Sequence, residues 1–193
     1  MGEEIKNKMK NSNSKRNIKD SELKEKLQSL SNDELYSLVL EIAKLRKENY
    51  EWLQAKLKGE TGINETLEYY KKKINEALGD DRIKLIDAKK AISDFRKISN
   101  KPEYVIELMV FYVETGIEIE NEFGDLYEAF YYSVESVFYN IVKLLNANQK
   151  LIFVFKDRLS RVIEMSAEGW GHKDSLSDIF ENLDTKDETT NRS

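Results

Sequence analysis

Three carboxylates and one amide follow each other at helical spacing in the middle of the chain. Glu114, Glu118, Asn121 and Asp125 are separated by four, three and four residues. In one continuous helix they would lie within about 60° of arc, since each residue advances by about 100°. Such a stripe suits a preorganised polar site on a rigid helix. It suits a solvated helix face equally well, and the sequence leaves both interpretations open.

The only histidine lies in a second polar segment, Gly169–Asp174, which reads GWGHKD. His172 and Asp174 fall at a predicted helix start, where the helix dipole favours a carboxylate. One interpretation is a structural helix start, with Trp170 in the core. The other makes His172 a general base or a ligand that faces Glu114 and Glu118. This functional interpretation requires His172 to lie within about 6 Å of those carboxylates in an open cleft.

The residue inventory excludes several classes of site. With no Cys and one His, the chain lacks thiolate ligands, disulfides and the paired Glu-x-x-His motifs of di-iron bundles. No glycine-rich phosphate loop, dinucleotide fingerprint or nucleophile elbow occurs. A hard cation needs only oxygen ligands, so Glu114, Glu118 and Asp125 could hold Mg²⁺ or Mn²⁺. Outside this alternative we predict no cofactor.

Charge is distributed unevenly along the chain. Residues 1–101 carry 23 Lys/Arg and 18 Asp/Glu, whereas residues 102–142 carry nine Asp/Glu and no Lys or Arg. The middle segment also holds ten of the eighteen Tyr and Phe residues. Its first helix gathers five glutamates on one side: Glu103, Glu107, Glu114, Glu118 and Glu122. Like charges at this spacing repel by roughly 0.2–0.5 kcal/mol per pair, so they need either solvent or a partner.

Two residues of the same helix are unusual for their positions. Glu120 falls at the centre of that side, where a carboxylate needs a buried partner, and we expect Arg158 or Arg161 in this role. Gly116 lies in mid-helix, where glycine costs about 1 kcal/mol relative to alanine. Close approach of a neighbouring helix would explain it.

Apolar residues recur with helical period, and helix breakers are few. The 193 residues include one Pro and eight Gly, and no segment shows sustained alternation of period two. Ser31 to Glu34 form a capping box, Asn64 is a candidate cap and Pro102 suits a first helical turn. We predict eight or nine helices, near 21–30, 31–57 (with a restart near 48), 64–78, 86–98, 102–124, 125–146, 149–168 and 172–183.

The predicted fold class is all-α. We expect an irregular bundle of eight or nine antiparallel helices, with a short α-solenoid of helical hairpins as the alternative. Residues 20–183 would form one domain between a disordered basic tail (1–19) and a disordered acidic tail (184–193). No apolar run approaches the ~18–20 residues of a membrane span, and none resembles a signal peptide. We therefore expect a cytoplasmic protein without a membrane partner.

Several short segments, in this order, resemble one bacterial family, domain of unknown function 6155. They are LKEKLQSLSNDEL from Leu23, AKKAI from Ala88 with Phe95, FYVETG from Phe111, the Asn121–Asp125 stretch, FYYSVES from Phe130 and GWGHKD from Gly169. The resemblance covers residues 20–183. It implies an all-helical fold with no assigned activity. It also directs attention to Glu114, Glu118, Asn121, Asp125, His172 and Asp174 as candidate site residues.

The leading functional hypothesis is a non-enzymatic helical interaction module. Its acidic, aromatic-rich segment, residues 102–142, would bind a basic protein segment or a second copy of the chain. The alternative is a hydrolase dependent on a divalent cation that uses Glu114, Glu118, Asp125 and His172. A second alternative is association with nucleic acid through residues 1–97. The basic patches there are Tyr69–Lys73 and Lys89, Lys90, Arg96 and Lys97, and the basic tail would add phosphate contacts.

Overall fold

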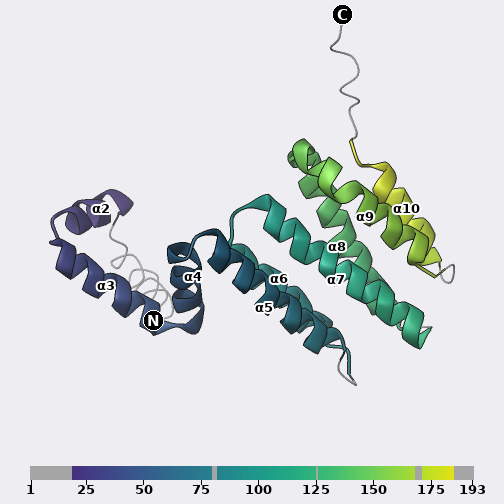
Figure 1. Cartoon of the computed structure of the whole chain (residues 1–193), viewed down its shortest axis with the longest axis horizontal. Coiled ribbons are helices and arrows are strands. Elements are labelled where there is room, and N and C mark those ends of the chain that lie inside the picture. The colour runs from purple at the N-terminus through teal and green to yellow at the C-terminus, as the bar shows by residue number, and fades with distance from the viewer. Residues whose placement is uncertain (1–18, 80–81, 125, 168–170, 185–193) are drawn as a thin grey trace, which may run out of the picture. The chain divides into compact units, whose positions relative to one another are not determined.

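The computed structural model describes residues 19–79, 82–124, 126–167 and 171–184. In these ranges the chain forms nine α-helices and one short 3-10 helix, and it forms no strand (Figure 1). The all-α prediction is therefore confirmed. The elements are α2 (Asp20–Gln28), α3 (Asn32–Leu45), α4 (Lys47–Leu57), α5 (Glu60–Leu78), α6 (Leu85–Ile98), α7 (Pro102–Phe123), α8 (Glu128–Ala147), η1 (Gln149–Leu151), α9 (Ile152–Met165) and α10 (His172–Glu181).

The chain divides between Tyr50 and Glu51 into two compact units. The first contains α2 and α3. The capping box at the start of α3 is confirmed, because Ser31 N donates to Glu34 Oε2 at 2.8 Å and Glu34 N donates to Ser31 Oγ at 3.3 Å. The single domain expected over residues 20–183 stays a prediction.

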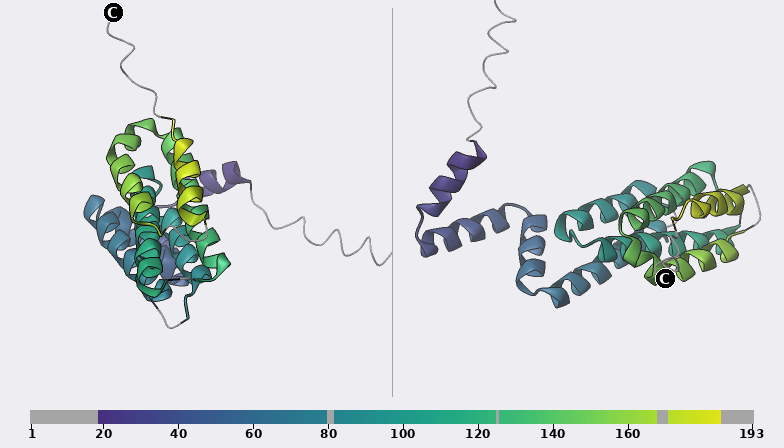
Figure 2. Two further views of the ribbon diagram at one scale, coloured as in Figure 1. Left: turned by 90° about the vertical axis from the view of Figure 1, so that its right-hand side faces the viewer. Right: turned by 90° about the horizontal axis from the view of Figure 1, so that it is seen from above.

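The second unit is a helical bundle in which α7 packs against α5, α6, α8 and α9 (Figure 2). Helix α10 packs against α8 and α9. The central position of α7 follows from its sequence, because apolar residues occupy most of its circumference. Twelve of its residues are buried, which leaves only a narrow side for its glutamates. No helix in the described ranges is long and apolar enough to cross a membrane.

Helices α7 and α8 approach each other closely at Gly116. A Cβ placed on Gly116 would lie 2.8 Å from Val134 Cγ2. The expectation that a neighbouring helix explains this glycine is therefore confirmed. Four residues before Gly116, the buried Tyr112 hydroxyl lies 2.6 Å from Ser133 Oγ. This hydrogen bond satisfies two buried hydroxyls where water is excluded.

Helix ends differ from the sequence predictions by up to four residues. The helix expected to begin at Asn64 begins at Glu60, because Gly59 adopts a φ of 63° and the chain restarts directly after it. The helix expected to reach residue 168 ends at Met165. The helix expected from Asp125 begins at Glu128, and Asp125 itself lies outside the described residues.

Candidate functional site

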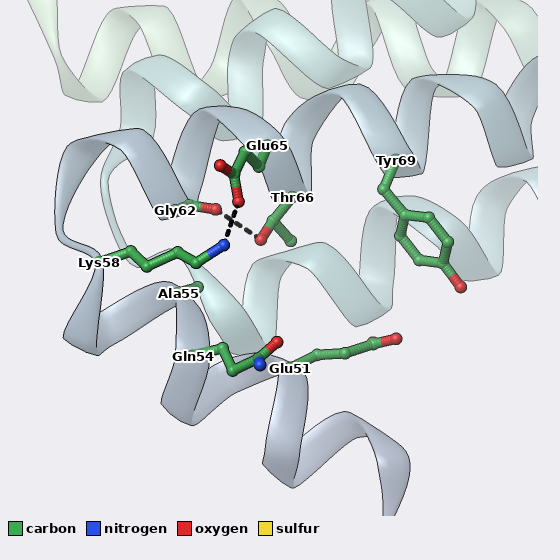
Figure 3. Close-up of a pocket in the computed structure, with 8 residues that line it drawn as sticks. All are labelled: Glu51, Gln54, Ala55, Lys58, Gly62, Glu65, Thr66 and Tyr69. Carbon is green, nitrogen blue, oxygen red and sulfur yellow. Dashed lines mark hydrogen bonds and ion pairs between the residues drawn. The ribbon is translucent and has the colours of Figure 1, made fainter.

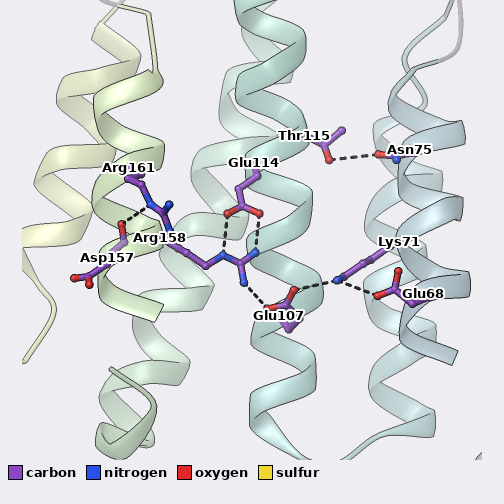
Figure 4. Close-up of polar contacts among 9 residues, drawn as sticks. All are labelled: Glu68, Lys71, Asn75, Glu107, Glu114, Thr115, Asp157, Arg158 and Arg161. Atoms are coloured by element: carbon purple, nitrogen blue, oxygen red, sulfur yellow. Dashed lines mark hydrogen bonds and ion pairs between the residues drawn. The ribbon is translucent and has the colours of Figure 1, made fainter. Parts of the chain in front are cut away.

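The acidic side of α7 contacts basic side chains from two of its neighbours, α5 and α9. Arg158 on α9 binds Glu114 through two parallel contacts, Nε to Oε1 at 2.9 Å and Nη2 to Oε2 at 2.7 Å. Its Nη1 also donates to Glu107 Oε2. Lys71 on α5 approaches Glu107 Oε1 at 3.0 Å and Glu68 at 3.1 Å. Figure 4 shows this ion network, which ties α5, α7 and α9 together.

The network changes how its members titrate. Partial burial raises the pKa of Glu107, but hydrogen bonds from Arg158 and Lys71 outweigh burial, so the net pKa lies below its usual value. Hydrogen bonds to Glu114 raise the pKa of Arg158 above its usual range, against the opposing effect of burial. Glu107 and Arg158 therefore stay charged together over a wide pH range. Two of the five glutamates on this side of α7, Glu107 and Glu114, thus have basic partners within the chain.

Glu118 and Asn121, the other described residues of the predicted polar stripe, do not join the ion network. Glu118 is exposed. Asn121 donates from Nδ2 to the backbone oxygen of Met165 at 2.9 Å, a bond that connects the end of α7 to the end of α9. Asp125 lies outside the described residues, so its place in the stripe stays a prediction.

His172 is the first residue of α10 and is buried, with 1% of its surface exposed. It follows Gly171, whose φ of 70° is a left-handed conformation that favours glycine. His172 Nδ1 lies 2.9 Å from Glu135 Oε1 on α8. This contact fixes the orientation of the imidazole ring at the start of α10. The Tyr131 ring packs against the imidazole, with centroids 5.0 Å apart.

Glu120 and His172 face each other inside the protein. Glu120 is 2% exposed, and its Oε2 lies 3.9 Å from His172 Nε2. Neither of these two buried atoms has a hydrogen-bond partner among the described residues. Burial raises the pKa of Glu120, opposed by the nearby imidazole and by a hydrogen bond from the Ala167 backbone. The buried partner expected for Glu120 was Arg158 or Arg161, and this expectation is wrong.

This expectation is wrong because the packing of the helices gives both arginines other partners. Arg158 is already held by the opposite side of α7, through Glu107 and Glu114. Arg161 is exposed and donates to the backbone oxygen of Asp157 at 3.4 Å. Only the fold brings the start of α10 beside the apolar side of α7. The single His in the chain was the available signal. A neutral imidazole tolerates burial, and it becomes a cation when it binds a proton.

The predicted pairing of His172 with the α7 stripe is not among the contacts that the structure describes. Its polar neighbours are Glu120 and Glu135, on the apolar side of α7 and on α8. Because His172 is buried, it does not line an open cleft. Asp174 is exposed in the first turn of α10. Among the described residues, no three His, Asp or Glu side chains are grouped so that they could hold a metal ion.

Helix α8 carries part of the exposed surface of the acidic, aromatic segment, and Glu118, Glu122 and Phe123 of α7 carry another part. The solvent side of α8, here called the α8 outer face, consists of the exposed residues Glu128, Tyr132, Ser136, Tyr139 and Lys143. Tyr132 and Tyr139 are 62% and 56% exposed. Tyr132 donates a hydrogen bond to Glu128, which raises the tyrosine pKa. These residues share one side because they recur three or four apart. Sequence reasoning identified the segment but not this side of it.

A shallow pocket lies between α4 and α5 (Figure 3). Its lining includes Lys58 and Glu65, which already form an ion pair at 2.6 Å, and Thr66, which donates to the backbone of Gly62 at 2.7 Å. Lys58, Glu65 and Thr66 thus already have partners within the protein.

Several of the basic residues predicted to contact nucleic acid have local partners. Lys71 binds two glutamates, Lys97 lies 2.7 Å from Asp94, and Lys72 lies 3.8 Å from Glu76. Lys73 covers the rings of the neighbouring tyrosines of α5 at 4.7 and 5.1 Å. These contacts reduce the positive charge that α5 and α6 present to solvent.

The comparisons with known proteins find no match. No family model, curated protein or solved structure matches the chain. The resemblance to domain of unknown function 6155 therefore stays a prediction.

Proposed function

We propose that the chain is a non-enzymatic helical interaction module that binds a protein partner through the α8 outer face. The observation that carries the proposal is the exposure of Tyr132 and Tyr139 on one rigid helix, 62% and 56% respectively. Tyrosine side chains are enriched in protein interfaces, because they bury a large area for a small loss of conformational freedom. Large aromatic residues exposed on a single helix side mark a contact surface.

Two glutamates of segment 102–142 are not available to a partner. Glu107 and Glu114 are bound to Arg158, so they serve the bundle rather than a partner. Glu128, in contrast, is exposed beside Tyr132. It gives the α8 outer face an acidic end that would attract a basic group of the partner.

Site-directed photo-crosslinking in the cell of origin tests the proposal. A photoreactive phenylalanine analogue placed at Tyr139 should give a discrete adduct with another protein chain. The matched control carries the analogue at Phe153, which is 74% exposed on α9 of the same unit. Adding Glu128→Lys to the Tyr139 sample should remove the adduct. Equal labelling at Tyr139 and Phe153, or no adduct at Tyr139, would contradict the proposal.

A further inference from the structure

The pattern of the α8 outer face is symmetric about its own centre. Reading outward from the midpoint between Glu135 and Ser136, Tyr132 on one side matches Tyr139 on the other. Further out, Glu128 matches Lys143. The four outer residues are exposed, and the next buried residues of α8 occupy the opposite side of the helix. Such a helix is complementary to a copy of itself turned end for end.

From this symmetry we infer that the partner of the α8 outer face is a second copy of the chain, bound with the two α8 helices antiparallel. This inference rests on the proposed function and specifies its partner. A two-fold axis through the midpoint places each Tyr132 beside Tyr139 of the other copy. The same axis places each Glu128 beside Lys143 of the other copy. Every contact therefore occurs twice, as two-fold symmetry requires.

Charge selects the antiparallel arrangement over the parallel one. In a parallel pair each Glu128 would face Glu128 of the other copy, and each Lys143 would face Lys143. Both are repulsive contacts, whereas the antiparallel pair makes both attractive. Lys143 is also the first basic residue after Lys101. The run without Lys or Arg thus ends at the one position where the antiparallel pair requires a positive charge.

The size of the surface predicts a weak dimer. Residues 128–143 span about 23 Å of helix at 1.5 Å per residue. One helix face of this length lies at the small end of specific interfaces. The two Glu128–Lys143 pairs lie at the exposed ends, so salt should weaken the dimer by screening them. We therefore expect association that depends on both protein and salt concentration.

A charge-exchange experiment tests both the partner and the register. Purified full-length Glu128→Lys and Lys143→Glu variants should each be monomeric in sedimentation equilibrium, because each places two like-charged pairs in the dimer. An equimolar mixture of the two variants should dimerise, because both pairs become attractive in the mixed dimer. The double variant Glu128→Lys with Lys143→Glu should also dimerise. Glu118→Lys, on exposed α7 surface, is the matched control and should behave as the wild type.

Cysteine cross-linking gives an independent readout, because the chain has no natural Cys. Under mild oxidation, a mixture of Tyr132→Cys and Tyr139→Cys chains should form disulfide dimers faster than either variant alone. Faster cross-linking of each variant with itself would overturn the antiparallel register.

The failure of this inference is distinguishable from failure of the proposed function. If the purified wild type is monomeric at every concentration and the charge-exchanged mixture does not associate, the second copy is not the partner. In that case an adduct at Tyr139 that contains a different protein would leave the proposed function standing. An adduct of twice the chain mass supports both.

Discussion

Replacing Arg158 by Met should destabilise the second unit by about 2–3 kcal/mol. The substitution keeps an unbranched apolar stem and removes three charge-assisted hydrogen bonds, two to Glu114 and one to Glu107. Losing one partner of a hydrogen bond to a charged group costs about 1.5–3 kcal/mol. The three side chains are 24–31% exposed, so water replaces part of what is lost. Lys71 still neutralises Glu107, which confines most of the cost to Glu114.

Urea denaturation followed by far-ultraviolet circular dichroism measures this loss as a change in the free energy of unfolding. A double-mutant cycle with Glu114→Gln isolates the pair, and Arg158→Met should cost about 1–2 kcal/mol less in that background. Arg161→Met is the matched control, because Arg161 is exposed on the same helix and contacts only the backbone of Asp157 among the described residues. If Arg158→Met changes stability no more than Arg161→Met, or if the cycle shows additivity, the network does not hold the helices together.

Two further substitutions test the packing and the titration inside the bundle. Gly116→Ala should lower the free energy of unfolding by about 1–2 kcal/mol, because the clash with Val134 exceeds the ~1 kcal/mol gain in helix propensity. Val134→Ala should then destabilise the Gly116→Ala variant less than it destabilises the wild type. Stabilisation by Gly116→Ala would refute the close contact. Glu120→Gln should flatten the dependence of stability on pH. A pKa raised in the folded state means that the folded protein binds more protons, so the contribution of Glu120 is complete below its ordinary pKa of 4.5 and is lost as pH rises through the folded value. Urea titrations from pH 4 to 8 should therefore show the wild type losing stability relative to Glu120→Gln as pH rises. A difference between the two proteins that stays constant with pH would contradict the raised pKa of Glu120. The same pH-dependent effect from the exposed control Glu118→Gln would contradict it as well.

The helices could be predicted because their signals are local. The Ser31 capping box, Pro102 in the first turn of α7 and Gly124 at its end depend only on nearby residues. The period of the apolar residues likewise follows from the geometry of one helix. Gly59 shows the limit of this reasoning, since its left-handed conformation moved the start of α5 to Glu60.

The partners of the charged residues were decided only by the tertiary structure. The sequence placed five glutamates on one side of α7 and Glu120 on the other, but it contained no signal for which of Arg158, Lys71 and His172 each would meet. Those partners lie 36 to 52 positions away along the chain and arrive on three different helices. Their pairing depends on how helices rotate and pack, which long-range contacts determine together. Glu107 and Glu114 therefore bond helices together, whereas Glu118 stays exposed.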